Sequence, residues 1–180
     1  MPSRDVWSHG SGNALRDLLS SALASLLMAP AGGEPAYFSS PWLSDFPLFE
    51  NHYGDFVALF PELADERRIR FSDYLRQLSR RRPVRIITVR NQSSEYFAKS
   101  PAFQGADGVL FRYAPETYHE KGVLTPAFYI EGSMNITYSG VYVRGEKITY
   151  HSGAEAPLRS KIGKAYLEFN RRWDQLPADA

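Results

Sequence analysis

Apolar residues recur along the chain at two spacings, which predict helices and strands that alternate. Leucines and alanines at helical spacing from Leu15 to Leu27 form one apolar face, with Asn13 and Pro30 marking the two ends of this helix. Ser72 is the predicted cap of a second helix, whose Leu75 and Leu78 face the core. The other predicted helices are a short one at 95–99 and a closing amphipathic one at 157–176.

Runs of β-branched and aromatic residues between these helices predict six strands. The predicted strands are 36–38, 84–89, 109–113, 118–124, 127–130 and 147–150. The aromatic-rich segment 46–60 receives no assignment, because Pro47, Gly54 and Pro61 interrupt or border it. Alternating strands and helices without repeats or a linker predict one α/β layered domain over 1–180, with its core at about 14–175.

Composition excludes several classes of protein. The 180 residues are 43% hydrophobic and 23% charged, which is typical of a globular domain. The absence of cysteine excludes disulfide frameworks, thiolate metal sites and cysteine nucleophiles, and favours a reducing, cytoplasmic location. Arg16 and Asp17 interrupt the longest apolar stretch, at 14–31, so neither a membrane span nor a signal peptide is expected.

A histidine and a lysine two residues apart are the first candidates for chemistry. If 118–124 is a strand, alternation places His119 and Lys121 on one face and Glu120 on the other. A neutral imidazole beside an ammonium group suits attack on a phosphate, because the cation offsets charge on the phosphoryl oxygens. Taken alone, the pair also fits an exposed strand face.

Two later segments supply groups that complement this pair. Gly132 allows close approach of a ligand to the backbone, and Ser133 and Asn135 are neutral donors for a phosphate, although these residue types are also common in turns. Glu146 is a candidate to accept the Nδ1 hydrogen of His119 and so leave Nε2 for attack. The alternative for Glu146 is a solvated acid paired with Lys147.

The combination of His119-x-Lys121, Gly132-Ser133-x-Asn135 and Glu146 resembles the HKD signature of the phospholipase D superfamily. The resemblance spans about residues 14–175 and implies a phospholipase D-like layered fold, with a mixed central β-sheet flanked by helices. It departs from the family pattern at one place, because the motif aspartate is replaced by Pro126, or by Thr125 if the spacing is shortened by one residue. In the family that aspartate supports the architecture of the site, so its absence leaves a catalytically silent domain as an alternative.

The resemblance implies a mechanism and a partner. Family members need two facing copies of the motif, so this single-motif chain is similar to the short bacterial endonucleases that form their site across a homodimer. His119 would attack phosphorus to give a phosphohistidine, and Lys121, Ser133 and Asn135 would hold the phosphate. No metal or other cofactor is implied, and His9, His52 and His151 are expected to be surface or structural residues.

The substrate is inferred from charge. The chain has 21 basic and 20 acidic residues, yet nine arginines and one acid, Asp73, lie between Arg67 and Arg90. This local excess favours a polyanion, with DNA as the predicted substrate, although a solvated helix face explains it equally well.

Two other functions remain open. One is phospholipid head-group hydrolysis with Trp42, Phe46, Phe49, Tyr53 and Phe56 as an apolar mouth, unless these residues belong to the core. The other is a catalytically silent DNA-binding component, since similar single-motif proteins occur among bacterial phage-defence and DNA-modification clusters, which would make defence-system proteins its partners.

Overall fold

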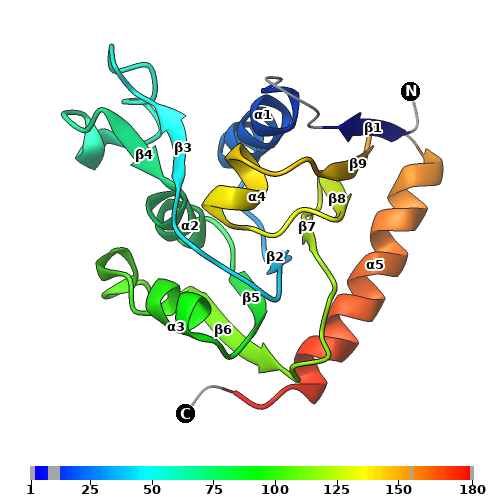
Figure 1. The fold of residues 1–180 in the computed structure, drawn as a ribbon. Helices are drawn as coiled ribbons and strands as arrows, with labels where there is room; N and C mark the ends of the chain where they lie inside the picture. The colour runs from blue at the N-terminus through cyan, green and yellow to red at the C-terminus, as the bar shows by residue number, and fades with distance from the viewer. Residues whose placement is uncertain (1–2, 8–12, 155, 179–180) are drawn as a thin grey trace.

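The computed structural model describes residues 3–7, 13–154 and 156–178. Its centre is a seven-stranded mixed sheet in the order β1-β9-β8-β7-β2-β5-β6 (Figure 1). The strands in chain order are β1 (Ser3–Trp7), β2 (Ala36–Ser39), β5 (Val84–Val89), β6 (Val109–Ala114), β7 (Gly122–Leu124), β8 (Phe128–Gly132) and β9 (Lys147–Ser152). β2, β5 and β6 are parallel to one another, and the remaining neighbours pair antiparallel. The predicted α/β layered fold with a mixed central sheet is therefore confirmed.

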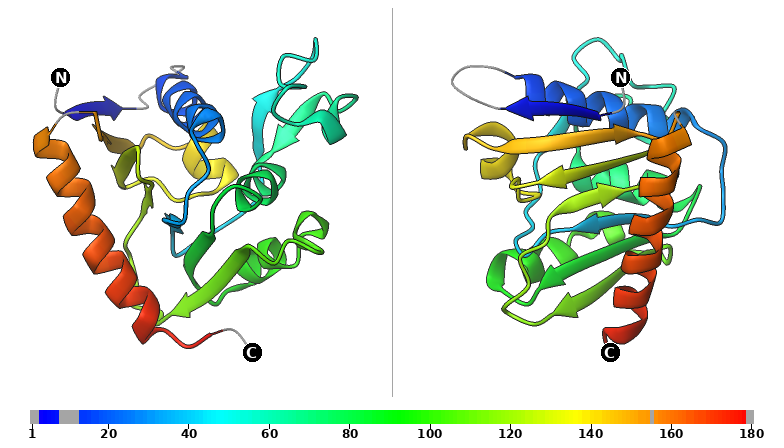
Figure 2. Two further views of the ribbon diagram at one scale, coloured as in Figure 1. Left: turned by 180° about the vertical axis from the view of Figure 1, so that it is seen from behind. Right: turned by 90° about the vertical axis from the view of Figure 1, so that its right-hand side faces the viewer.

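Helices cover both faces of the sheet. The helices are α1 (Ala14–Met28), α2 (Phe71–Ser79), α3 (Gln92–Ala98), α4 (Tyr138–Tyr142) and α5 (Ala156–Gln175), with short 3-10 turns η1 (Pro61–Leu63) and η2 (Pro101–Phe103). α5 crosses the strands on one face, and α1 to α4 lie on the other (Figure 2). A two-stranded arm, β3 (Pro47–Glu50) with β4 (Arg68–Arg70), projects beside α2.

The alternation of side chains along the strands divides the core into two layers. Phe38, Ile86 and Ile130 point toward α1 and α2, whereas their chain neighbours Tyr37 and Ile87 pack with α5. A central strand such as β5 is buried on both faces, which explains its continuous apolar sequence. The two layers hold the strands, and hence their ends, in fixed register.

Several predicted elements need correction. The predicted strand 118–124 is wrong in its first half, because β7 begins only at Gly122 and the segment before it is irregular. Ser72 lies inside α2 rather than at its cap, and the N-cap position is Arg70, whose backbone N–H donates to Asp73. The unassigned segment 46–60 contains β3, and β1, β4 and α4 were also missed.

Candidate active site at one end of the sheet

The predicted site residues lie in segments that adjoin one end of the sheet because of strand direction. β2, β5, β6 and β8 end there, while β7 and β9 begin there. Lys121 immediately precedes β7, Ser133 immediately follows β8, and Glu146 immediately precedes β9. Gly122 pairs with Glu131 and Gly132 with Ile148, so Lys121 and Ser133 come from adjacent strand ends. Lys121 and Gly132 line the same narrow hollow.

The segment that carries His119 is fixed by side-chain contacts rather than by strand pairing. The Ser39 hydroxyl lies 2.5 Å from the Tyr118 hydroxyl and 3.3 Å from the Glu120 carbonyl oxygen. Burial raises the pKa of the Tyr118 hydroxyl, which keeps it protonated as a hydrogen-bonding group. Glu120 pairs with Arg172 of α5, which turns this carboxylate away from its neighbours in the motif. His119 is left exposed between two anchored residues.

Lys121 is oriented by its own neighbour. Its Nζ donates to the carbonyl oxygen of His119 at 2.7 Å. One of three ammonium hydrogens is used in this way, so the others can bind an anion. This contact is with the backbone of His119, so the prediction that the two side chains point to one space stays a prediction.

Ser133 is held at the end of β8 by β9. Its N–H donates to the Lys147 carbonyl oxygen at 2.9 Å, and its Oγ accepts the Lys147 N–H at 3.1 Å. Its hydroxyl hydrogen is donated to Glu146. Glu146 is thus in contact with Ser133, and the orientation of His119 by Glu146 stays a prediction. For Ser133 to donate to a phosphate, its hydroxyl has to turn away from Glu146.

Asn135 is connected to the loop that follows β2. Ser40 is fully buried, and its Oγ donates to the Trp42 carbonyl oxygen at 2.6 Å and accepts the Ile136 N–H at 3.1 Å. The Asn135 Oδ1 lies 3.4 Å from the same hydroxyl. Ser40 therefore joins two loops that are far apart in the sequence, a role that the sequence analysis missed.

Trp42 stands between two open clefts at this end of the sheet. A cleft of about 280 Å³ is lined by His119, Arg90 and Trp42, and a second of about 610 Å³ by Asn135, Ser44 and Trp42. The Trp42 side chain is 53% exposed, although the next residue, Leu43, is fully buried. A large aromatic surface is therefore presented to any ligand that reaches both His119 and Asn135.

The other aromatic residues of the proposed apolar mouth are not gathered there. Phe46 and Phe49 are buried, and Phe56 packs against the same core. Tyr53 is exposed in the turn after β3. These residues therefore form no continuous apolar mouth beside His119.

Thr125, one of the two candidates for the position of the missing motif aspartate, stabilises the turn in which it lies. Thr125 is fully buried in the turn between β7 and β8. Its Oγ1 accepts the N–H groups of Ala127 at 3.3 Å and Phe128 at 3.0 Å, and donates to the Phe128 carbonyl oxygen. An aspartate carboxylate could accept the same two N–H groups, so threonine supplies part of that support. This turn lies at the opposite end of β7 from His119.

Most arginine side chains of the arginine-rich stretch form hydrogen bonds or ion pairs within the protein. Seven of the nine arginines have partners: Arg68 with Glu50, Arg70 with Asp45, Arg80 with Glu62, Arg90 with Glu95, Arg81 and Arg82 with backbone carbonyls, and Arg85 with Tyr37. The side chains of the other two, Arg67 and Arg76, have no hydrogen bond or ion pair with any described residue. A continuous phosphate clamp over this stretch is therefore not formed.

The other histidines differ in environment. His151 is buried, and its Nε2 lies 2.8 Å from both Glu131 Oε1 and Lys161 Nζ. Burial alone would raise the pKa of Glu131, but hydrogen bonds from Lys161 and His151 hold that pKa below its usual value. His151 is thus structural, as expected, and His52 lies exposed beside Glu50. His9 lies outside the described residues.

The described residues contain no group of three or more histidine, aspartate or glutamate side chains that could hold a metal ion. Over the same part of the chain, no helix is long and apolar enough to cross a membrane.

The arrangement of sheet and helices is similar to that of several solved structures, one of which is a phospholipase D family member. Nuc from Salmonella typhimurium, a phospholipase D family member, is 14% identical, with a TM-score of 0.56 over 98% of this chain and 97% of that one. NucT from Helicobacter pylori is 12% identical, with a TM-score of 0.58 over 98% and 99% of the two chains. TrmBL2, an archaeal chromatin protein with a novel mode of DNA binding, is 8% identical, with a TM-score of 0.55 over 99% of this chain and 54% of that one.

No family model and no curated protein matches the sequence. At identities this low, the likeness to the solved structures concerns the fold. The phospholipase D-like fold expected from the sequence is confirmed by it.

Proposed function

We propose that the protein is a metal-independent phosphodiesterase, and more narrowly a nuclease that cleaves DNA through a phosphohistidine. The observation that supports the proposal is that the segments carrying His119, Lys121, Ser133, Asn135 and Glu146 all adjoin the same end of the sheet. A nucleophile, a cation, neutral donors and an acid are the groups that transfer of a phosphoryl group requires. The likeness in fold to Nuc, a phospholipase D family member, supports the same reaction class.

The proposed reaction has two steps. His119 Nε2 attacks phosphorus and forms a P–N bond while the bond from phosphorus to the leaving oxygen breaks. His119 of the partner subunit donates a proton to that oxygen. It then takes a proton from water, whose oxygen attacks phosphorus and breaks the P–N bond, so that both imidazoles return to their starting state.

A symmetric homodimer would supply the second histidine. The sequence has one His-x-Lys motif, whereas the reaction uses a nucleophile and a separate proton donor. His119 is exposed at the sheet end, so a two-fold axis near this end can bring two copies of the site together. Lys121 and Asn135 of both chains would then surround one phosphate.

DNA is favoured over phospholipid as substrate. Phe46 and Phe49, which an apolar mouth would need, are buried in the core instead. The alternative of a silent DNA-binding component, working with defence-system proteins, keeps one argument, namely that Pro126 or Thr125 replaces the motif aspartate. Because Thr125 already supports the turn after β7, we favour the active enzyme. Its organisation as one domain and its cytoplasmic location stay predictions.

The test is cleavage of bis(p-nitrophenyl) phosphate and plasmid DNA in the presence of EDTA. The parent protein should cleave both, and His119→Ala should reduce the rate at least about a thousandfold, because the nucleophile is lost. His52→Ala is the matched control, since His52 is exposed and lies away from the site residues on the β3–β4 arm. Equal cleavage by His119→Ala and the parent would overturn the proposal. No cleavage by the parent would favour the binding component.

A further inference from the structure

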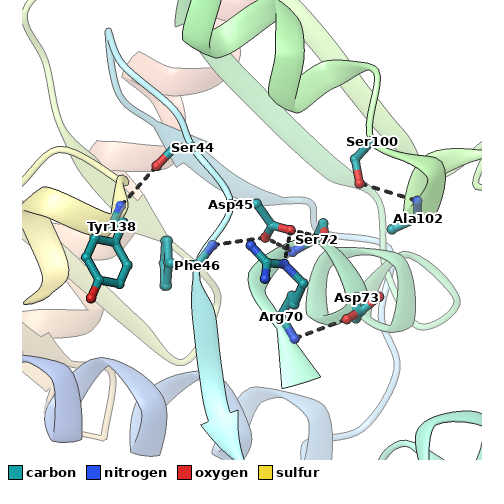
Figure 3. Close-up of polar contacts among 9 residues, drawn as sticks. All are labelled: Ser44, Asp45, Phe46, Arg70, Ser72, Asp73, Ser100, Ala102 and Tyr138. Atoms are coloured by element: carbon teal, nitrogen blue, oxygen red, sulfur yellow. Dashed lines mark hydrogen bonds and ion pairs between the residues drawn. The ribbon is translucent and has the colours of Figure 1, made fainter. Parts of the chain in front are cut away.

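A second groove, outside the proposed catalytic residues, lies between α2 and the segment formed by α3 and η2. Its volume is about 840 Å³, larger than that of either cleft beside Trp42. Asp45 and Arg70 lie at its polar side, and Arg76, Lys99 and Tyr96 line it as well. Figure 3 shows Arg70 turned toward Asp45 and Ser72, with Ser100 on the facing segment.

The charged side chains of this groove are of two kinds: an ion pair, Asp45 with Arg70, and two cations that form no ion pair with a described residue, Arg76 and Lys99. Asp45 accepts from Arg70 Nε at 2.6 Å, from the Ser72 hydroxyl at 2.9 Å and from the Ser72 N–H at 3.0 Å (Figure 3). Its charge is therefore compensated within the protein. Arg76 and Lys99 are exposed, and their side chains form no hydrogen bond or ion pair with any described residue.

Only one acid opposes these two cations. Asp73 lines the groove and accepts the Arg70 N–H at 3.0 Å, so its carboxylate is engaged with the start of α2. The groove thus keeps a net positive charge, which suits an anionic ligand. It contrasts with the rest of the arginine-rich stretch, where, apart from Arg67, the arginine side chains have partners within the protein.

The groove and the cleft that contains Asn135 are lined by neighbouring residues of the same two segments. Ser44 lines that cleft, and the next residue, Asp45, lines the groove. On α3, Ser93 lines the cleft while Tyr96, three residues later and hence on the same side of the helix, lines the groove. A strand that starts at His119 and passes Trp42 would therefore reach Arg76 and Lys99 by following α3.

Aromatic surfaces accompany the cations along this path. Trp42 is 53% exposed near its start, and Tyr96 is 83% exposed near its end. Alternating cations and exposed aromatic rings are how proteins hold single-stranded nucleic acids, since phosphates meet the cations and unpaired bases stack on the rings.

We propose that this groove is a second binding site for a single-stranded nucleic acid whose scissile phosphate lies at His119. The inference rests on the proposed function for the class of substrate and adds a contact remote from the reaction. Lys99 lies six residues beyond Ser93, roughly 9 Å along the helix. At about 3.4 Å per stacked nucleotide, the strand reaches Lys99 roughly three nucleotides after leaving the cleft.

The proposal is tested by binding of labelled oligonucleotides in the His119→Ala background, where no cleavage by the proposed mechanism interferes. The probes are (dT)4, (dT)16, (U)16 and a 16-base-pair duplex. We expect Arg76→Ala/Lys99→Ala to weaken binding of (dT)16 about tenfold or more, and that of (dT)4 much less. The slope of log affinity against log salt should fall by roughly 1.4, from two lost phosphate contacts at about 0.7 each.

The matched control is Arg159→Ala/Lys164→Ala, which removes one arginine and one lysine from exposed positions on α5, on the other face of the sheet. Equal binding of (dT)16 by the two double variants would overturn the proposal. So would an equal loss of duplex binding, because it would remove the preference for single strands. The (U)16 arm distinguishes RNA from DNA as the source of the strand.

Stacking has a separate readout. Tyr96→Ala should weaken binding of (dT)16 but not of an abasic 16-mer, whereas Tyr53→Ala, which removes another highly exposed tyrosine, should weaken neither. Equal binding by Tyr96→Ala and Tyr53→Ala would contradict the stacking contact. All these measurements stand even if the parent protein cleaves nothing, so failure of the proposed function and failure of this site are distinguishable.

Discussion

Individual polar side chains, placed at strand ends, position the candidate site. The residue types of the site were predicted from the sequence, because His119, Lys121, Ser133, Asn135 and Glu146 form a recognisable series. Their contacts were not predictable. Ser40 meets Asn135 across 95 positions of sequence, and no local pattern reports such a contact. The sequence signal for the role of Ser40 was its place directly after a predicted apolar strand and before Pro41.

Thr125 carries the residue-scale prediction. Thr125→Val keeps the shape of the side chain but leaves the N–H groups of Ala127 and Phe128 without its oxygen. Since the site is fully buried, we expect a loss of roughly 1–3 kcal/mol in the free energy of unfolding, measured by urea denaturation. Cleavage per folded molecule should not change, because the turn lies at the far end of β7 from His119.

Thr125→Ser is the control for this prediction. It keeps the hydroxyl and should stay within about 1 kcal/mol of the parent, because it removes a single methyl group. If Thr125→Val were as stable as Thr125→Ser, the hydroxyl would not be supporting the turn. A loss of cleavage with unchanged stability would instead assign this position to the reaction.

At the scale of whole elements, the sequence predicted the helices and strands whose own residues show a clear apolar periodicity or a continuous apolar run. Strand β5 has the predicted bounds, and the ends of α1 and α5 lie within two residues of the ends predicted for these helices. The strands β1, β3 and β4 were missed because they are short or polar and owe their conformation to partners far along the chain. The predicted strand at 118–124 failed in its first half because side-chain contacts, rather than a hydrogen-bonded ladder, fix Tyr118 to Lys121.

Gly132 links the pairing of β8 and β9 to the position of Ser133. A Cβ at this residue would overlap the Lys147 carbonyl oxygen and lie 2.8 Å from the Ile148 Cα, both backbone atoms that cannot move independently. Gly132→Ala should therefore push the ends of β8 and β9 apart and cost roughly 1–3 kcal/mol of stability. The same shift displaces Ser133 from Lys147 and Glu146, so we expect cleavage to fall more than about tenfold.

Thermal unfolding and cleavage rates measured on the same samples check this prediction. Gly163→Ala is the control, because a Cβ there meets no atom within 4 Å and alanine favours the helix. Gly163→Ala should be as stable as the parent or more stable by up to about 1 kcal/mol, with full activity. Normal cleavage by Gly132→Ala would show that the close approach of β8 and β9 is not needed for the site.

For the molecule as a whole, most of the arginines form ion pairs or hydrogen bonds within the protein, and few are left to bind a substrate. The pairs Arg70–Asp45, Arg80–Glu62 and Arg68–Glu50 connect the arginine-rich stretch to preceding acidic segments. The nearly balanced total of 21 basic and 20 acidic residues agrees with this use. Binding of a polyanion is then a local property of the cations left over, and its salt dependence should reflect few phosphate contacts.

The shared active site is the whole-molecule prediction, and it is testable by mixing subunits. If each site needs His119 from both chains, a heterodimer of parent and His119→Ala subunits is inactive. After unfolding and refolding together, activity should then follow the square of the parent fraction, so that an equal mixture keeps about a quarter of full activity. Independent sites would keep about half.

Mixing with His52→Ala subunits should leave activity unchanged, because His52 lies on the arm and not at the sheet end. Sedimentation equilibrium on the same samples measures the mass directly. A monomer that retains activity would contradict the shared site, since one chain would then supply nucleophile and proton donor by itself.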